Sequence, residues 1–261
     1  MPRTTTDPCV DTEAPMLNVE QARAELLQHA QPLDTREHLD LMHTAGRVLA
    51  QDLASPIDVP GFDNSAMDGY ALRSSDIETA QADGLEIVQR IPAGTVGEYL
   101  DAGCTARIFT GAPLPEGADT VVMQEHCRVE DNRLFVEHAV NAGANIRPRG
   151  NDIMTGKTIL HSGTLMKAAQ LGLAASVGIT GVDVFTRLKV AIFSTGDELV
   201  EPGNPLGPGQ IYNSNRYQLS ALLQAQGCDV IDLGTAVDTF AATRKTLLLA
   251  AEQADLVITT G

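Results

Sequence analysis

Residues 61–71, with the sequence GFDNSAMDGYA, concentrate short oxygen-bearing side chains, among them Asp63 and Asp68. Turn chemistry is one explanation, because Asn and Asp bond their own backbone and an Asp-Gly pair favours positive φ. The other explanation is a site for a hard cation such as Mg²⁺, which binds through one or two carboxylates together with substrate phosphates. The stretch alone leaves both explanations open.

The segment IFTGAPLPEGADTVV, residues 108–122, joins two expected strands through a Thr-Gly turn. A connection in which prolines protect a sheet edge is the structural interpretation. The functional interpretation places the Thr110 hydroxyl and nearby backbone N–H groups against an anion.

Two arginines flank a carboxylate in RPRGNDI, residues 147–153. Arg147 and Arg149 beside Asp152 form either a surface ion cluster, which contributes little stability, or a site for phosphate with its counter-cation, because forked guanidiniums suit phosphate oxygens. The overlapping GNDIMTGKT is not a P-loop, since five residues rather than four separate its two glycines and no buried strand precedes it.

Two polar segments border the apolar strands expected in the last third of the chain. STGDEL, residues 194–199, overlaps the end of LKVAIFSTG, residues 188–196. The latter is a continuous apolar run, which is typical of a parallel strand buried on both faces. Ligands of open α/β sheets bind at the carboxyl ends of the strands, which makes Ser194, Thr195 and Gly196 candidate ligand-binding residues. Because the loop lacks G-x-G-x-x-G, a nicotinamide-dependent oxidoreductase is disfavoured.

The second polar segment is NSN, residues 213–215, which opens the next expected helix. At least one of the three residues is expected to cap that helix. A helix start beside a strand end is also an anion site, which adds Asn213 and Ser214 to the candidates.

Composition bounds the class of protein. The chain has 261 residues, 43% of them hydrophobic, which is typical of a soluble globular protein large enough for two or more domains. Its 18 basic and 34 acidic residues give a net charge of −16, and it has no Trp, so nucleic acid and anionic membrane are unsuitable partners. A small anionic ligand is not excluded, because arginines and helix N-termini close to a binding site offset the repulsion from the net negative charge of the chain.

Targeting signals and cysteine chemistry are also informative. No apolar run approaches the ~20 residues that span a bilayer. Residues 1–16 lack the apolar core of a signal peptide and are expected to form a disordered tail. The four cysteines form no C-x-x-C, which argues against a disulfide framework or a zinc ribbon and fits a reducing compartment. His126 and Cys127 are adjacent, and we interpret them as structural because metal ligands are usually spaced further apart. The expected location is the cytoplasm.

Short-range patterns predict the elements of the first half. A helix over 18–30 is capped by Asn18, with a glutamine at the capping-box position. A short strand near 38–42 and a brief helix over 44–53 follow. Between about 55 and 150, short strand candidates separated by Gly, Pro and Asp clusters indicate a small β-barrel or sandwich. These candidates are YALR, LEIVQR, ARIF, DTVVMQE and RLFVEH.

In the second half of the chain the pattern of apolar and polar residues changes. A helix is expected over 164–178, with Thr164 as its cap and Gly178 past its end. Apolar runs and helical patterns then alternate; strands are expected over 188–196, 228–236 and 255–261, and helices over 215–227 and 238–254. Asp238 is the expected cap of the last helix. Strand–helix alternation indicates right-handed crossovers and an open, doubly wound α/β sheet.

Taken together, five motifs in one order closely resemble the molybdopterin molybdenumtransferases, which are the MoeA-type enzymes and the catalytic half of gephyrin. The motifs are GFDNSAMDGYA, IFTGAPLPEGADTVVMQE, IRPRGNDI, AIFSTGDELVEPG and IYNSNRYQLSALL. The resemblance runs from about residue 17 to the last residue.

The fold implied by the resemblance is a multidomain α/β protein. A β-rich, barrel-like domain covers about 55–150, and a small discontinuous linker domain comes from 31–54 and 151–186. A doubly wound three-layer α/β domain covers 187–261 and packs with the helix at 17–30. The family continues beyond the last residues of this chain, completing the α/β domain and adding a C-terminal β domain, so the α/β domain is expected to be incomplete here.

The resemblance implies a reaction as well. Molybdate is inserted into adenylylated molybdopterin with the help of Mg²⁺, AMP is released, and molybdenum cofactor is formed. Members form elongated homodimers in which the site is shared between subunits, and a molybdopterin adenylyltransferase is a candidate partner. Activity of a chain this short, on its own, is not part of that expectation.

Site residues follow from the motifs. Those expected to act in the reaction are Asp63, Thr110, Asp152 and Glu198. Those expected to bind the substrate are Arg147, Ser194, Thr195, Gly196, Asn213 and Ser214. Those expected to hold Mg²⁺ are Asp63, Asp68 and Glu198.

Electrostatics favours a cation at such a site. Unit charges 4 Å apart repel by about 1 kcal/mol in water and by about 4 kcal/mol at an effective dielectric near 20. Molybdate and a phosphorylated substrate both carry negative charge, so the carboxylates are better suited to hold a metal than to hold molybdate. The alternative is a non-catalytic pterin-binding or scaffolding protein of the same fold, which keeps the barrel and the dimer surface without needing the metal.

Overall fold

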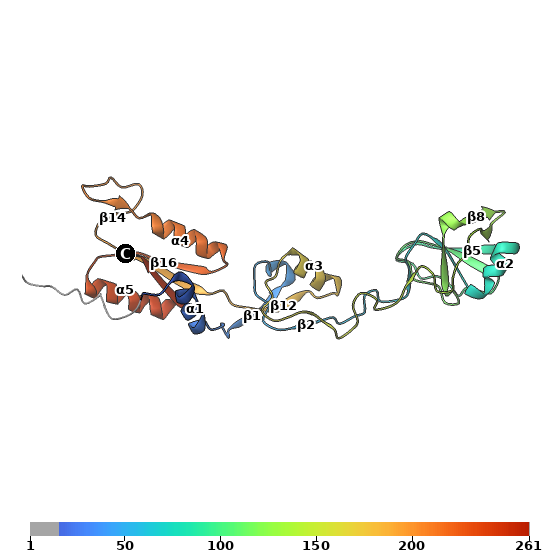
Figure 1. Cartoon of the computed structure of the whole chain (residues 1–261), viewed down its shortest axis with the longest axis horizontal. Coiled ribbons are helices and arrows are strands. Elements are labelled where there is room, and N and C mark those ends of the chain that lie inside the picture. The colour runs from blue at the N-terminus through green and yellow to red at the C-terminus, as the bar shows by residue number, and fades with distance from the viewer. Residues whose placement is uncertain (1–15, 261) are drawn as a thin grey trace, which may run out of the picture. The chain divides into compact units, whose positions relative to one another are not determined.

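The computed structural model describes residues 16–260 of the chain, so the tail predicted for 1–16 lies almost entirely outside the described residues. The chain divides into two compact units (Figure 1). Residues 36–185 form one of them, which we call the β-rich unit. Residues 16–35 and 186–260 form the other, the α/β unit. Figure 1 does not fix the position of one relative to the other.

The β-rich unit is built around a six-stranded mixed sheet with the order β7-β4-β6-β5-β9-β8. Its strands are β4 (Gly69–Leu72), β5 (Leu85–Ile91), β6 (Cys104–Ile108), β7 (Thr120–Met123), β8 (Cys127–Glu130) and β9 (Arg133–Val136). β5 and β6 run parallel and the other neighbours antiparallel. Five of these strands correspond to the predicted strand candidates, whereas β8 and the helix α2 (Ile77–Ala82) were not predicted.

Buried apolar side chains lie on both faces of the six-stranded sheet. One buried cluster contains Ala71, Ile91 and Ile108, and a second contains Leu72 and Leu134. Successive residues of β4 therefore enter different clusters, as expected for a strand whose side chains point alternately to opposite faces.

Three short strand pairs and one further α-helix also belong to the β-rich unit, together with the short 3-10 helices Leu41–His43, Ser74–Asp76 and Gln124–His126. The pairs are β1 (Arg36–Asp40) with β12 (Gly181–Phe185), β2 (Leu53–Ala54) with β11 (Thr158–Leu160), and β3 (Asn64–Ser65) with β10 (Ile146–Arg147). The helix is α3 (Ala168–Ser176). A separate buried cluster, which includes Leu49, Met166 and Val184, forms where segments from both ends of this unit meet.

Two local predictions in this unit were wrong. The helix expected over 44–53 is absent, because Gly46 adopts a positive φ of 76° and Leu49 bridges to Val184. Thr164 does not cap α3; its carbonyl accepts from the Leu49 N–H, and the helix begins only after Lys167. In both places pairing with a distant segment outweighs local helix preference.

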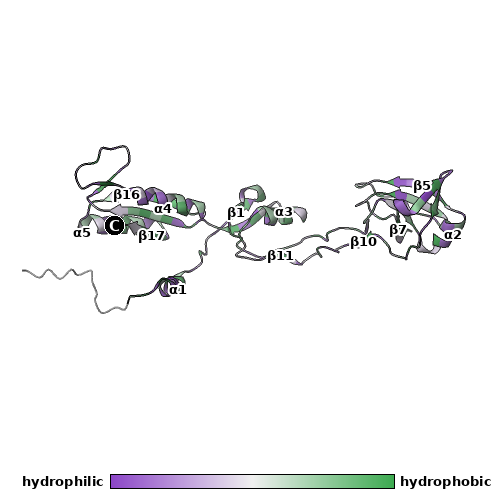
Figure 2. Ribbon diagram, turned by 45° about the horizontal axis from the view of Figure 1, so that its top comes forward, coloured by the Kyte–Doolittle hydropathy of each residue, from purple (hydrophilic) through white to green (hydrophobic). Residues whose placement is uncertain are grey.

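The α/β unit contains three parallel strands in the order β16-β13-β17. They are β13 (Lys189–Thr195), β16 (Asp229–Ala236) and β17 (Leu256–Thr260), connected by α4 (Ser214–Ala225) and α5 (Phe240–Gln253). The two helices lie on opposite faces of this sheet (Figure 1), as right-handed crossovers in opposite directions require. Apolar residues, green in Figure 2, run along the strands. The predicted strand–helix alternation is confirmed.

Helix caps in the α/β unit follow short-range rules with one exception. α1 (Val19–His29) has the predicted capping box from Asn18 and Gln21, and none of its residues is buried. Its packing with the sheet stays a prediction. The expected cap Asp238 is wrong: Thr239 caps α5, with its hydroxyl accepting from the Ala242 N–H at 3.3 Å.

Candidate functional site

The structure brings Asp68 and Thr110 together. Asp68 precedes β4 and Thr110 follows β6, and these strands are antiparallel neighbours with Gly69 opposite Ile108. Asp68 Oδ1 accepts from the Thr110 backbone N–H at 2.8 Å and from its hydroxyl at 2.7 Å. These bonds, with a smaller contribution from the positive charge of Arg107, lower the pKa of Asp68. The anion that the Thr-Gly turn holds here is a carboxylate of the same chain.

Asp63 contacts the arginine segment. Its Oδ1 accepts from the Arg149 backbone N–H at 2.7 Å. The contact depends on the β3–β10 pair, in which Asn64 lies opposite Arg147. Two motifs separated by more than eighty residues in sequence therefore meet at one antiparallel bridge.

The predicted pair of Arg147 and Asp152 is also present. Arg147 Nη2 donates to Asp152 Oδ2 at 2.6 Å, and the Asn151 side chain donates to Asp152 Oδ1 at 2.8 Å. The Asn151 bond and then the Arg147 bond lower the pKa of Asp152. Both of its oxygens are engaged, and the pair is exposed.

Asp58 is a member of this neighbourhood that the sequence analysis missed. Its Oδ1 accepts from the Thr155 backbone N–H at 2.7 Å and its Oδ2 from Arg149 Nε at 2.6 Å. These bonds, the Thr155 N–H first, lower its pKa. Asp58, Arg149 and Thr155 line one hollow together with Phe62. The available signal was a carboxylate in the turn SPIDVPG, directly before the first motif.

Asn64, within the first motif, is the second missed feature. Its side chain is 6% exposed, and its Oδ1 has no hydrogen-bond partner among the described residues. Leaving a buried acceptor unpaired costs about 1–3 kcal/mol. Asn64, the neighbour of Asp63 in sequence, therefore presents a buried oxygen that can accept a hydrogen bond from a ligand.

In the α/β unit, polar side chains connect the carboxyl ends of the three strands. Ser194 at the end of β13 donates to Asn213 Oδ1 at 3.3 Å and is 3.1 Å from the Thr260 hydroxyl on β17. Asn213 Nδ2 donates to the Thr235 hydroxyl on β16 at 3.1 Å. Ser194 and Asn213 are 1% and 2% exposed. Both therefore support the strand ends from inside.

Other residues of the predicted set adjoin this support, and among them Glu198 and Ser214 are exposed. Glu198, Asn213 and Ser214 line a hollow of about 210 Å³ together with Tyr212 and Thr260. Gly196 has a φ of 141°, and a Cβ built there would lie 2.6 Å from Glu198 Oε2, so only glycine lets the carboxylate lie over this turn.

Arg216, in the first turn of α4, was not predicted. It donates to Asp232 at 2.7 Å and contacts Glu201 at 2.8 Å. Bonds to Asp232 and then to Glu201 raise its pKa. This network fixes the start of the helix against β16, and the sequence gives no sign of it because its acidic partners are distant along the chain.

Asp63 and Asp68 offer a partial set of oxygen donors for Mg²⁺. Asp63 and Asp68 are each held through Oδ1 alone, and across residues 16–260 no hydrogen bond reaches either Oδ2. Within the same range, no three His, Cys, Asp or Glu side chains lie close enough together to hold a metal. The donor set fits an ion that binds one or two carboxylates and takes its other oxygens from substrate. Glu198 belongs to the other unit.

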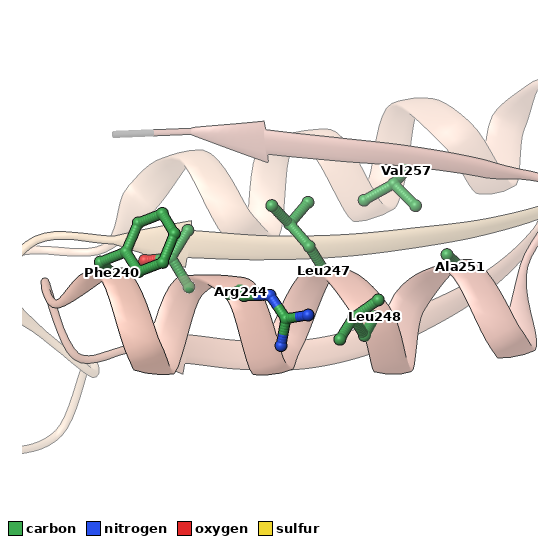
Figure 3. Close-up of a pocket in the computed structure, with 7 residues that line it drawn as sticks. Phe240, Arg244, Leu247, Leu248, Ala251 and Val257 are labelled. Atoms are coloured by element: carbon green, nitrogen blue, oxygen red, sulfur yellow. The ribbon is translucent and has the colours of Figure 1, made fainter. Parts of the chain in front are cut away.

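A more apolar hollow lies along α5. Phe240, Leu247 and Leu248 on α5 line it together with Val257 on β17, and Arg244 is the charged side chain among them (Figure 3). A site for chemistry needs converging polar groups. This hollow lacks them, and we assign no chemistry to it.

The fold and these strand-end sites define a multidomain α/β protein with a parallel sheet that offers polar residues at its carboxyl edge. The model of the MoeA N-terminal region (domain I and II) matches residues 17–178, and that of the probable molybdopterin binding domain matches residues 191–261. The chain belongs to the MoeA family. None of the helices within residues 16–260 is long and apolar enough to cross a membrane.

Relatives agree with this assignment. A molybdopterin molybdenumtransferase of Haemophilus influenzae is 43% identical over 249 residues, which is 94% of this chain and 61% of the relative. One from Nostoc is 43% identical over 86% of this chain and 52% of the relative. The crystal structure of a molybdopterin biosynthesis MoeA protein from Pyrococcus horikoshii matches with a TM-score of 0.85 at 31% identity, over 93% of this chain and 65% of that one. The chain thus spans about half to two thirds of the length of these relatives.

Proposed function

We propose that this chain forms part of a molybdopterin molybdenumtransferase, which inserts molybdate into adenylylated molybdopterin and releases AMP. The observation that carries the proposal is the state of two motif carboxylates. Asp63 and Asp68 are each oriented through one oxygen by backbone N–H groups, and the second oxygen of each is left for a cation. Carboxylates fixed in this way are pre-organised and cost little to order on binding.

Mg²⁺ is the proposed cation, held by Asp63, Asp68 and Glu198. When bound, it neutralises oxyanions that would otherwise repel one another, a contribution of several kcal/mol. Thr110 keeps Asp68 ionised and oriented, since its N–H and hydroxyl both donate to Oδ1. Asp152 holds Arg147, whose guanidinium is directed to a substrate phosphate.

The α/β unit is proposed to bind the pterin substrate. Ser214 and Asn213 stand at the N-terminus of α4, where the helix dipole favours an anion. Thr195 and Gly196 form the adjoining turn, and Ser194 keeps Asn213 in place from beneath. Glu198 extends over that turn with its carboxylate exposed.

Assembly and location complete the proposal. The acidic residues of the two units are expected to meet in a homodimer whose site is shared between subunits, with a molybdopterin adenylyltransferase as the partner that supplies the adenylylated substrate. Free Cys104, Cys127 and Cys228 are compatible with the cytoplasm as a reducing compartment.

The test is Mg²⁺-dependent AMP release from adenylylated molybdopterin, measured with the full-length protein that contains this chain. Asp63→Ala and Glu198→Ala are expected to abolish AMP release and cofactor formation while the far-UV circular dichroism spectrum stays unchanged. Exposed Glu78→Ala on α2 is the control and should release AMP normally. Normal release by both Asp63→Ala and Glu198→Ala would refute the assignment, and binding of pterin without any AMP release would indicate a scaffolding protein.

A further inference from the structure

Two arginines lie side by side on the six-stranded sheet. Arg90 on β5 is opposite Arg107 on β6, and Tyr70 on β4 is opposite Arg107 on its other side. The guanidinium carbon of Arg90 is 4.5 Å from the centroid of the Phe109 ring, and that of Arg107 is 4.8 Å from it. Arg107 also stacks over the Tyr70 ring at 5.0 Å.

Neither the Arg90 nor the Arg107 guanidinium forms an ion pair within residues 16–260, although the chain carries an excess of sixteen acidic charges. Arg107 donates to the Gly69 carbonyl at 3.1 Å and to the Gln124 side chain. Like charges on neighbouring strands repel, so this arrangement costs stability unless an anion offsets it.

Arg128 provides the comparison within the same sheet. Its guanidinium also stacks on a phenylalanine, at 4.5 Å from the centroid of Phe135. It is nevertheless paired with Glu130 and Glu137. Stacking on an aromatic ring therefore does not account for the missing carboxylates at Arg90 and Arg107.

The arginine pair adjoins the proposed catalytic residues. Phe109 directly precedes Thr110, and the charge of Arg107 contributes to the lowered pKa of Asp68. Aromatic rings hold the guanidiniums in place, while the N–H groups of Arg90 donate to no other described residue. An ordered guanidinium with free donors suits an oxyanion.

We propose that Arg90 and Arg107 form a binding site for a tetrahedral oxyanion beside the Asp68–Thr110 contact. The oxyanion is either molybdate or the phosphate group of the adenylylated substrate, which share charge and donor requirements. The proposal rests on the proposed function, because Asp68 is a proposed Mg²⁺ ligand and the two arginines add positive charge beside it for an anionic reactant.

The experiment is titration calorimetry at low ionic strength with EDTA present, using sodium molybdate and AMP as separate probes. Arg90→Gln and Arg107→Gln are each expected to weaken binding of at least one probe about tenfold, the loss of one charge-assisted hydrogen bond or more. Arg128→Gln should bind as the wild type does. Arg90→Gln removes no hydrogen bond within the protein, so it decides the matter if Arg107→Gln fails to fold.

Each outcome has one meaning. A loss confined to molybdate, or one confined to AMP, supports the site and identifies its ligand, and a loss of both supports a shared site. Unchanged affinity in Arg90→Gln, an equal loss in Arg128→Gln, or a wild type that binds neither probe overturns it. AMP release measured in parallel separates this result from the proposed function: release that needs Asp63 but not Arg90 leaves the transferase assignment standing without the arginine site.

Discussion

Replacing Asn213 with alanine should destabilise the α/β unit through several bonds at once. The Asn213 carboxamide caps α4 by accepting from the Arg216 N–H at 3.3 Å. It also accepts from the Ser194 hydroxyl at 3.3 Å and donates to the Thr235 hydroxyl at 3.1 Å. Because the side chain is 2% exposed, water cannot take over these bonds in the variant.

The magnitude follows from these contacts. Loss of an N-cap costs about 1 kcal/mol. Each of the two side-chain hydrogen bonds contributes about 0.5–1.5 kcal/mol. Ser194 keeps its contact with Thr260, and Thr235 keeps one with Glu201, so no full desolvation penalty is added. The free energy of unfolding of the α/β unit should fall by about 2–4 kcal/mol, which for a unit of this size lowers its Tm by on the order of 10 °C.

Differential scanning calorimetry measures this change and contains an internal reference. The two compact units should unfold in separable transitions, and only that of the α/β unit should shift. Asn215→Ala is the matched control, since Asn215 is exposed and lies in the same helix turn. A decrease below about 0.5 kcal/mol, or one equal to that of Asn215→Ala, would refute the role of Asn213 as the connector of the strand ends.

Three further predictions use other features. Gly196→Ala should destabilise the α/β unit by about 1–3 kcal/mol, because its φ of 141° is one that residues with a side chain rarely adopt, and a loss below about 0.5 kcal/mol in calorimetry would contradict this. Asp68→Asn should lower Tm at neutral pH. The pKa of Asp68 in the native protein lies below its ordinary value of 3.8, chiefly because the Thr110 N–H donates to the carboxylate. The stability that ionised Asp68 contributes is therefore present above pH ~3.8 and is lost as the pH falls through the lower pKa of the folded state. A Tm difference between Asp68→Asn and the wild type that persisted at pH ~2 would argue against this role of Asp68. Burial raises the pKa of the Cys127 thiol to about 12, so iodoacetamide at pH 8 should leave Cys127 unmodified in the native protein, and rapid alkylation seen by peptide mass spectrometry would count against its burial.

Short-range patterns were sufficient for most elements. The apolar runs that became β13, β16 and β17 are recognisable because strands buried on both faces have few polar residues. The capping box of α1 was readable because its two partners are three residues apart. The wrong predictions at 44–53 and at Thr164 have one cause. These two segments pair with each other, and local helix preference carries no information about pairing between distant segments.

The candidate site shows the same division. The motifs identified the residue types, and the structure then joined Asp68 to Thr110 and Asp63 to Arg149. Asp58, Asn64 and the Arg90–Arg107 pair escaped detection because each is ordinary in its own segment. Asp58 is distinguished by a hydrogen-bond donor that is distant in sequence, and Asn64 by a buried oxygen without a partner among the described residues. The arginine pair is distinguished by the like charge on the neighbouring strand.

The sequence by itself determined the family, the alternation of strands and helices in the α/β unit, and the turns in which acidic and hydroxyl groups gather. All of these depend on residue type and on spacing within a few positions. Only the tertiary structure decided which oxygen of each carboxylate is held and which is left free, that Ser194 supports the strand ends from the interior, and that two neighbouring arginines form no ion pair within residues 16–260. The physical reason is that these outcomes are fixed by strand register and burial, which bring together groups that are far apart along the chain.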